Sequence, residues 1–365
     1  MSTSSAGPPP LRRMIVPAIF VGALFLVVFL RQPNGPERPD QWVLTGRTMG
    51  TAFTVKTVVS PELGINQSAV ETAVRNAVDA VDFAMSTYRY DSELSRFNRQ
   101  GTTIFEISES LIEVVLEAQR VAELSAGAFD ITVGPLVDAW GFGPDPVADP
   151  PDADTIAELM ADSGFQLLEV DASKRTIRKN REALRCDLSA IAKGYAVDRV
   201  VDELDHLGLT DYMVEIGGEV SAVGTNAVGE AWRIGIELPE TGTGGLWSAV
   251  ALVDTAMATS GDYRNYYERD GVRISHTIDP RTGRPITHRL ASVTVIHASC
   301  MTADALATAL SVLGPEDGRE LVEREGLAAF FLIRTDDDGF KEWASDGWPS
   351  EVVAGVIDVD RDEDE

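Results

Sequence analysis

Strand-like and helix-like segments follow one another irregularly along this chain, and their order constrains the fold more than any other feature. Alternating apolar residues predict strands at Met213–Ile216, Val220–Val223 and Ala231–Leu238, with glycine turns between them. Helix-like patterns at Ala69–Met85 and from Ser189 through Leu204 lie among such strands. Because strand and helix do not alternate strictly, the sequence favours an α+β fold over a doubly wound sheet.

Further elements are predicted on both sides of these segments. Ser110 and Glu113 form a capping box for a helix that ends near Ser125, and Gly127 is its expected stop. Residues 141–154 are rich in proline and glycine and predict an exposed loop. The remaining predictions, in chain order, are a strand at Thr45–Val59, a polar loop at Arg89–Gly101, a helix at Asp154–Ser163, a hairpin of Gln166–Val170 and Thr176–Lys179, strands at Trp247–Val253, Ile274–Ile278 and Ala291–Ile296, helices at Thr302–Leu313 and Pro315–Glu325, and a last strand at Ala328–Ile333.

An unbroken apolar run from Met14 to Leu30 follows Arg12 and Arg13 near the N-terminus, and Arg31 follows the run. Its 17 residues are at the short limit for a transmembrane helix and are long for the apolar part of a signal peptide. We therefore expect an uncleaved, single-pass signal anchor in the cell membrane, with a cleaved signal peptide as the alternative. The paired arginines favour a cytoplasmic segment at 1–13 and a main domain on the extracytoplasmic, periplasmic side.

Composition divides the rest of the chain into a linker at 31–41, one large domain at 42–350 and an acidic tail at 351–365. The formal net charge of −27 argues against binding to a nucleic acid backbone. It is compatible with cation-assisted chemistry and equally with a halotolerant surface. Cys186 and Cys300 are compatible with one disulfide or with two buried thiols.

The run from Ser275 to Leu313 holds the first candidate site. His276 and a polar turn that ends at Gly283 precede a strand, and a helix follows with Asp304 and Thr308 on one face. A carboxylate and a hydroxyl are suitable ligands for Mg²⁺, which also takes phosphate oxygens. The alternative is an ordinary capped helix, with Thr302 as N-cap and Asp304 as a favourable charge in its first turn. His276 is either a general base or a structural histidine.

Three other segments could contribute to a site. Asp187 to Asp198 places Lys193 one turn into a helix whose free N–H groups could bind an anion, or it is simply an amphipathic helix. The segment from Gly127 to Leu136 could hold a planar ring or a ribose, or it is a proline-stiffened turn. Ser86 to Asn98 has aromatic residues that could stack on a ligand, although a solvated loop is the default interpretation.

Together, in this order, the motifs resemble those of the ApbE family, the FAD:protein FMN transferases. The resemblance covers roughly residues 42–335. It is carried by Met49-Gly50-Thr51, Ser86 to Asn98, Gly127-Ala128-Phe129-Asp130, Asp187 to Asp198, Glu215-Ile216-Gly217-Gly218, Ser260-Gly261-Asp262, His276 to Gly283 and Thr302 to Thr308.

The resemblance implies an α+β domain of two interlocked lobes, preceded here by the transmembrane helix. Such a protein would use Mg²⁺ and FAD to place FMN on a threonine or serine of an exported acceptor protein, with release of AMP. Carried over onto this chain, the metal ligands would be Asp304, Thr308 and the carbonyl of Ala190, and His276 would assist the attacking hydroxyl. The implied FAD contacts are Met49, Tyr88, Ala128, Phe129, Asp130, Asp187, Lys193 and Ile278.

One departure from the family pattern concerns the membrane anchor. Many members carry a lipid on a cysteine just after the signal, but no cysteine precedes Cys186 here, so Met14–Leu30 would itself be the anchor. The carried-over site also brings Cys186 and Cys300 close to the metal ligands, where a disulfide could form. Two other functions remain open: an FAD pyrophosphatase that releases FMN and AMP, and an exported FAD-binding protein without turnover.

Overall fold

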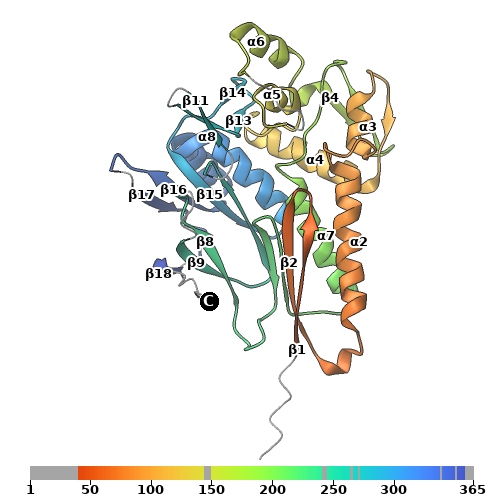
Figure 1. The fold of residues 1–365 in the computed structure, drawn as a ribbon, viewed down its shortest axis with the longest axis vertical. Coiled ribbons are helices and arrows are strands. Elements are labelled where there is room, and N and C mark those ends of the chain that lie inside the picture. The colour runs from red at the N-terminus through yellow and green to blue at the C-terminus, as the bar shows by residue number, and fades with distance from the viewer. Residues whose placement is uncertain are drawn as a thin grey trace, which may run out of the picture. The chain divides into compact units, whose positions relative to one another are not determined.

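A large sheet forms the centre of the computed structural model, which describes residues 40–143, 149–240, 245–263, 266–269, 272–337, 339–349 and 352–357. Within those residues the sheet has eight strands in the order β1-β2-β6-β7-β10-β15-β16-β17 (Figure 1). The pairs from β2 to β17 are antiparallel. The strands are β1 (Asp40–Thr48), β2 (Thr51–Val59), β6 (Tyr212–Ile216), β7 (Glu219–Val223), β10 (Thr255–Gly261), β15 (Leu290–His297), β16 (Ala328–Arg334) and β17 (Phe340–Ala344).

Alternation of side chains gives the sheet two apolar faces. In β16, Ala329 and Phe331 belong to the larger core cluster, whereas Phe330 and Leu332 belong to a second cluster. Successive side chains of a strand point to opposite faces, so the two clusters lie on opposite sides of the sheet. A sheet that is apolar on both faces needs a cover on each side.

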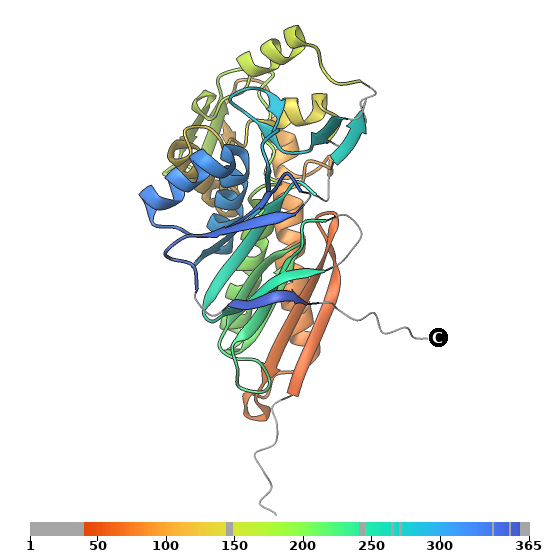
Figure 2. The same cartoon turned by 90° about the vertical axis from the view of Figure 1, so that its left-hand side faces the viewer.

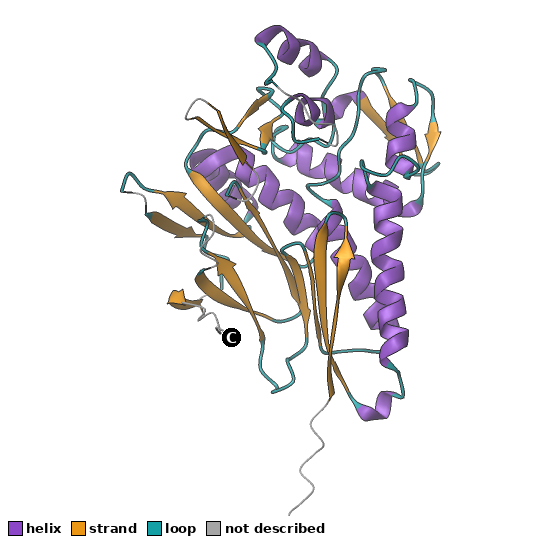
Figure 3. Ribbon diagram, in the orientation of Figure 1, coloured by secondary structure: helices purple, strands orange, loops and turns teal. Residues whose placement is uncertain are grey.

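Helices cover the face of the main sheet that carries the larger cluster, and they are the purple ribbons in Figure 3. Helix α8 packs most extensively against β10 and β15, and helix α7 packs most extensively against α2 and α8. Asn66 caps α2 by accepting a hydrogen bond from the Ala69 amide, and Ser299 caps α8 by accepting one from the Thr302 amide. The helices are α2 (Gln67–Met85), α3 (Glu93–Arg99), α4 (Glu109–Leu124), α7 (Ala192–His206) and α8 (Cys300–Glu325), the last with a kink at Gly314.

A second, three-stranded sheet covers the other face of the main sheet and lies in front of it in Figure 2. Trp232, Ile236 and Val250 from this small sheet pack in the second cluster with Met213 and Leu332 from the main sheet. Its strands, in spatial order, are β18 (Val352–Ile357), β9 (Leu246–Leu252) and β8 (Trp232–Glu237).

Smaller elements gather beyond one end of the main sheet, at the top of Figure 1. Leu136, Trp140, Ile156 and Ile278 form a separate apolar cluster there. The elements are α5 (Gly134–Ala139), α6 (Ala153–Ala161), the sheet of β3 (Phe105–Glu106), β5 (Thr176–Lys179) and β4 (Leu168–Asp171), the hairpin of β11 (Tyr266–Arg269) and β12 (Val272–Ser275), and the pair of β13 (Ile278–Asp279) and β14 (Arg284–Pro285). Two short 3₁₀ turns, η1 (Pro61–Leu63) and η2 (Phe165–Leu167), complete the list.

The predicted α+β class is confirmed, but several local predictions are wrong. The expected strand Thr45–Val59 is a hairpin, because Met49 and Gly50 both adopt positive φ and reverse the chain. The polar segment at Arg89–Gly101 contains α3, which Ser92 caps through the Ser95 amide. Ser108, and not Ser110, caps α4, and α8 begins at Cys300 with Ser299, and not Thr302, as its cap.

The described residues from Gln41 onward form one compact unit. The predicted membrane anchor at 14–30, residues 31–39 of the predicted linker at 31–41, and residues 351 and 358–365 of the predicted tail at 351–365 lie outside the described residues. The rest of the predicted linker and tail belongs to β1 and β18. Among the helices that the structure does describe, none combines the length and the apolar character needed to cross a membrane.

Candidate functional site

Hydrogen bonds from the N-terminal end of α8 to α7 hold the two helices together, and this contact positions the candidate site. The Asp198 carboxylate, in α7, accepts hydrogen bonds from the Cys300 amide at 2.8 Å, the Met301 amide at 3.0 Å and the Ser299 hydroxyl at 2.8 Å. These amides are the orphan donors of the first turn of α8, so a negative charge is favourable there. Asp304 follows one turn further along α8 and faces the start of α7.

A glycine allows the two helices to approach closely beside Asp304. The Gly194 amide donates to Asp304 Oδ2 at 3.0 Å. A Cβ atom built on Gly194 would lie 2.3 Å from the Cys300 carbonyl oxygen and 2.8 Å from Asp304 Cβ, so no other residue fits without displacement. The Asp304 residue is 2 % exposed.

Lys193 lies between two buried carboxylates. Its Nζ donates to Glu219 Oε1 at 2.9 Å and lies 3.7 Å from Asp304 Oδ1. Burial raises the pKa of both Asp304 and Glu219, although the lysine opposes this shift. Burial alone would lower the pKa of Lys193, but attraction to Asp304 and Glu219 outweighs it and raises that pKa. The lysine is therefore held as a fixed cation at a site that still leaves 26 % of its side chain exposed.

Glu219 is a site residue that the sequence did not single out. It begins β7, directly after Gly217-Gly218, and reads as an ordinary strand residue. In the structure it is 3 % exposed, and among the described residues its second oxygen, Oε2, has no hydrogen-bond partner. A buried carboxylate oxygen without a donor is costly unless a ligand, cation or water satisfies it.

If Asp304 binds Mg²⁺ and the chain consumes FAD, as the resemblance implies, replacing Glu219 with glutamine is expected to raise the Mg²⁺ concentration that gives half-maximal turnover by about ten-fold. The amide removes the charge that draws Lys193 away from Asp304, so the lysine would compete with a cation for the Asp304 carboxylate. Turnover of FAD across a Mg²⁺ titration measures this. Glutamine at Glu182, which is exposed, serves as the control. An unchanged titration curve in the Glu219 variant would mean that Glu219 does not position the lysine.

The hydroxyl of Thr308 is held beside a residue from the main sheet. Thr308 Oγ1 and Ser260 Oγ are 3.1 Å apart, which fixes the threonine one turn after Asp304 and on the same side of α8. Ala190 lies just before α7, and the Ile191 and Ala192 amides both donate to the Leu188 carbonyl in this turn. The Ala190 carbonyl is thus near the helix start that contacts Asp304.

The hairpin turn between β1 and β2 lies near Lys193 and its carboxylate partners Glu219 and Asp304. A Cβ atom built on Gly217 would lie 2.8 Å from Thr51 Cγ2 and 3.2 Å from Lys193 Cδ. Met49, at φ 46°, and Gly50, at φ 73°, form this turn. The structure therefore places the turn that contains Met49 and the side chain of Lys193, which are far apart in the sequence, at the same end of the strands of the main sheet.

The segment from Ala128 to Asp130 is buried and internally bonded. Asp130 Oδ1 accepts from the Thr132 amide and hydroxyl at 2.8 and 2.7 Å, and Oδ2 accepts from the Phe165 amide at 2.7 Å. Burial raises the pKa of Asp130, and these bonds oppose the shift. Because both carboxylate oxygens already have partners, Asp130 shapes the loop, and Ala128 and Phe129 are core residues that are almost fully buried.

Asp187 connects two of the predicted motifs. Its amide donates to the Ile131 carbonyl at 2.7 Å, and its Oδ1 accepts from the Ser189 amide at 2.8 Å. Next to it, the Asn98 side chain exchanges two hydrogen bonds with the backbone of Cys186, each 2.8 Å long. The Tyr88 side chain, 73 % exposed, is accessible for stacking.

His276 follows β12 in the region beyond the sheet. Its ring lies edge-on to Phe142, with ring centres 6.2 Å apart at 70°. Ile278 is buried in the apolar cluster with Trp140, whose indole N–H donates to the Gly283 carbonyl at 2.9 Å. A Cβ atom on Gly127 would lie 4.0 Å from Arg281 Cγ, so the turn after His276 lies beside the segment that begins at Gly127.

The candidate ligands fit a hard divalent cation in kind. A buried carboxylate, a hydroxyl and a backbone carbonyl are all oxygen donors, the set that Mg²⁺ prefers. The described residues hold no group of three or more His, Cys, Asp or Glu side chains placed to bind a metal. The orphaned Glu219 oxygen nearby is consistent with a bound cation or water.

The disulfide considered from the sequence is wrong. Cys186 and Cys300 are both buried and free. The Cys300 thiol donates to the Val220 carbonyl, with sulfur and oxygen 3.7 Å apart. Burial raises the pKa of both thiols, which keeps them protonated and inert.

Comparisons with known proteins agree on one family. The model of the ApbE family matches residues 49–331. An FAD:protein FMN transferase of Vibrio cholerae is 45 % identical over 85 % of this chain and 93 % of the relative, and one of Escherichia coli is 39 % identical over 92 % and 97 %. Two solved structures have a TM-score of 0.77 and cover 85 % of this chain. They are the flavin transferase ApbE from Vibrio cholerae, at 43 % identity over 98 % of that chain, and the apo flavinyl transferase ApbE from Pseudomonas stutzeri, at 41 % over 96 %.

Proposed function

Because this chain belongs to the ApbE family, we propose that it transfers FMN from FAD to a hydroxyl of an acceptor protein. The hydroxyl oxygen of a threonine or serine attacks the FMN phosphorus of FAD. A phosphoester bond to the acceptor forms, the bond to the bridging oxygen breaks, and AMP leaves with that oxygen. The observation that carries the proposal is the buried cluster of Lys193, Glu219 and Asp304, in a chain that matches the family over most of its length.

Charge on the phosphate oxygens must be neutralised as the new bond forms. Asp304, Thr308 and the Ala190 carbonyl would hold Mg²⁺, which when bound supplies positive charge to these oxygens. Lys193 supplies a second positive charge from the protein itself. Its two buried carboxylate partners fix it in place, so no reorganisation is needed during the reaction.

FAD in this proposal contacts both lobes of the predicted architecture. The main sheet with its helices contributes Met49 and Lys193, and the region around α5 and α6 contributes Ile278. The exposed Tyr88 ring would stack on a planar part of FAD. The resemblance also implies contacts at Ala128, Phe129, Asp130 and Asp187. The first three are buried, and the side chains of Asp130 and Asp187 already accept hydrogen bonds, so these residues would shape the FAD site more than they bond to FAD.

Replacing His276 with glutamine is expected to lower FMN transfer about a hundred-fold, because the acceptor hydroxyl would lose the base that takes its proton. The dissociation constant of FAD should change far less. Transfer rates and FAD binding by fluorescence quenching measure the two separately. His206, exposed at the end of α7, gives the matched control. Equal losses of binding and transfer at His276 would make it a structural residue.

The function itself is tested with the purified chain, FAD, Mg²⁺ and protein extract from the source cells. An acceptor heavier by one FMN in intact-mass spectrometry, with AMP released, supports the transferase. Free FMN and AMP without any labelled protein would point to an FAD pyrophosphatase. Bound FAD that is not consumed would leave a binding protein and would contradict the assigned roles of Asp304 and His276.

We also propose that Met14–Leu30 anchors the chain in the membrane with the main domain outside the cytoplasm. Support comes from the sequence pattern of Arg12 and Arg13 before the apolar run. Protease added to intact spheroplasts should then digest the domain. Protection of the domain until the membrane is broken would contradict this orientation.

A further inference from the structure

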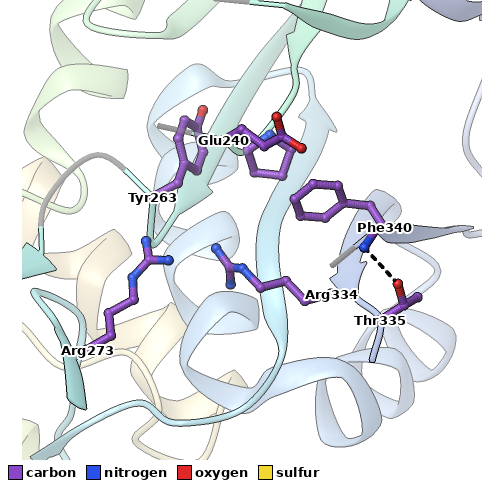
Figure 4. Close-up of a pocket in the computed structure, with 8 residues that line it drawn as sticks. Glu240, Tyr263, Arg273, Arg334, Thr335 and Phe340 are labelled. Atoms are coloured by element: carbon purple, nitrogen blue, oxygen red, sulfur yellow. Dashed lines mark hydrogen bonds between the residues drawn. The ribbon is translucent and has the colours of Figure 1, made fainter. Parts of the chain in front are cut away.

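A separate pocket of about 360 Å³ opens beside Tyr263, two residues after the end of β10, and Arg334, the last residue of β16 (Figure 4). Arg273 and Arg334 extend into it from different elements, and Tyr263 and Phe340 form aromatic walls. None of its lining residues belongs to the site described above. They are Pro239, Glu240, Tyr263, Arg273, Arg334, Thr335, Gly339 and Phe340.

The two arginines that line this pocket share one carboxylate partner, Asp262. Arg334 forms a bidentate pair with Asp262, with distances of 2.9 and 2.6 Å. Arg273 donates to the Asp262 backbone carbonyl at 2.6 Å and lies 3.9 Å from the same carboxylate. Its guanidinium also lies over the Tyr266 ring, 3.9 Å from the ring centre, so it is pre-positioned. The Glu240 carboxylate lies toward Phe340 and away from Arg273 (Figure 4).

This arrangement favours a single carboxylate group as ligand. Planar guanidinium groups match carboxylates in geometry, and both arginines keep part of their side chain exposed, 34 % for Arg273 and 26 % for Arg334. The volume is at the low end for small-molecule sites and is too small for a dinucleotide. It suits one amino-acid side chain.

The pocket is close in the chain both to Ser260, which contacts the proposed metal ligand Thr308, and to the proposed base His276. Ser260, which contacts Thr308, precedes Asp262 by two residues, or about 7 Å of extended chain. His276 follows Arg273 by three residues, or about 10 Å. A polypeptide that presents a hydroxyl to this site would therefore pass within reach of the two arginines.

We propose that the arginine pocket binds an acidic side chain of the acceptor protein and so selects which hydroxyl receives FMN. This inference rests on the proposed FMN transfer. Since the chain itself carries a net charge of −27, most of its surface would repel an acidic side chain of the acceptor. The two arginines would attract that side chain at one place only, which gives specificity.

The test replaces Arg273 with glutamine in the full chain and uses the acceptor that the wild-type chain labels. The KM for that acceptor is expected to rise about ten-fold or more, the effect of losing one charge-assisted hydrogen bond, while kcat and the Kd for FAD stay close to those of the wild type. Arg273 is chosen because Arg334 still neutralises Asp262 in this variant. Arg289→Gln removes an equal charge near the pocket, from an exposed ion pair with Asp336, and should leave KM unchanged.

Substitutions of acidic residues in the acceptor by their amides complete a double-mutant cycle with Arg273→Gln. One Asp→Asn or Glu→Gln change near the labelled hydroxyl should raise KM to the same extent, and combining it with Arg273→Gln should add little more. An unchanged KM in Arg273→Gln, or a parallel loss of FAD affinity, would overturn the proposal, the latter assigning the pocket to FAD. A wild-type chain that labels no protein would instead contradict the proposed function, and that result is seen before any variant is made.

Discussion

Asparagine at Asp304 is expected to lower the Mg²⁺-dependent rate of FAD consumption about a hundred- to thousand-fold. The substitution keeps an oxygen that can accept the hydrogen bond from the Gly194 amide, so the contact between α7 and α8 survives. It removes the buried negative charge that would hold a divalent cation beside Thr308. Lys193 retains Glu219 as its partner, so no buried cation is left unpaired.

Two measurements separate this effect from simple misfolding. The melting temperature of Asp304→Asn should stay within a few degrees of the wild type, because the side-chain volume is kept. Glu117→Gln is the matched control: Glu117 accepts a hydrogen bond from the Thr302 hydroxyl on the same helix, but it lies outside the site. Its rate should stay within about two-fold of the wild type. A wild-type rate in Asp304→Asn would remove Asp304 from the list of metal ligands.

Local patterns in the sequence predicted much of the fold, because the residues that determine such a helix or strand are neighbours in the sequence. The amphipathic helix at Ala69–Met85 is α2, which starts two residues earlier. The hairpin strand Thr176–Lys179 is β5, with the same bounds. In both cases the period of apolar residues and the bordering polar residues are sufficient.

Features that depend on contacts between distant residues were missed. Ser108 rather than Ser110 caps α4 because Glu93, from α3, accepts hydrogen bonds from the Ser108 amide and hydroxyl at 2.7 and 2.6 Å. β10 was not predicted, since Thr255–Gly261 has small residues on both faces and no alternation of size. The turn at Met49 needs a positive φ in a residue that rarely adopts it, so the sequence suggested a continuous strand.

In the candidate site, too, residues that belong to local motifs were predicted and residues defined by distant contacts were missed. The order of short motifs predicted Asp304, Thr308 and Lys193 as parts of one site, and the structure places Lys193 3.7 Å from Asp304, although each motif alone had an ordinary structural explanation. Glu219 had no such signal, because its role depends on Lys193, 26 residues earlier in the chain. The arginine pocket likewise joins Arg273 and Arg334 through Asp262, and no sequence period links these three positions.

Alanine at Gly194 is expected to disrupt both stability and catalysis. In an open helix, Gly→Ala would stabilise by about 1 kcal/mol. Here the added methyl group would lie 2.3 Å from a backbone carbonyl of α8, which cannot move away as a side chain could. Overpacking of this kind costs about 1–3 kcal/mol, so the melting temperature should fall by several degrees.

The effect on the rate should exceed the effect on stability. The clash falls on Cys300 and Asp304, so relief of it must move Asp304 away from α7 and weaken its bond to the Gly194 amide. A displacement of about 1 Å in a reacting group can cost about a hundred-fold in rate, even while the protein stays folded. FAD turnover measured well below the melting transition would show this loss, together with a raised Mg²⁺ requirement. Gly101→Ala, where a methyl group meets open space, should change neither property. If Gly194→Ala had the stability and rate of the wild type, the close contact of α7 and α8 could not be what positions Asp304.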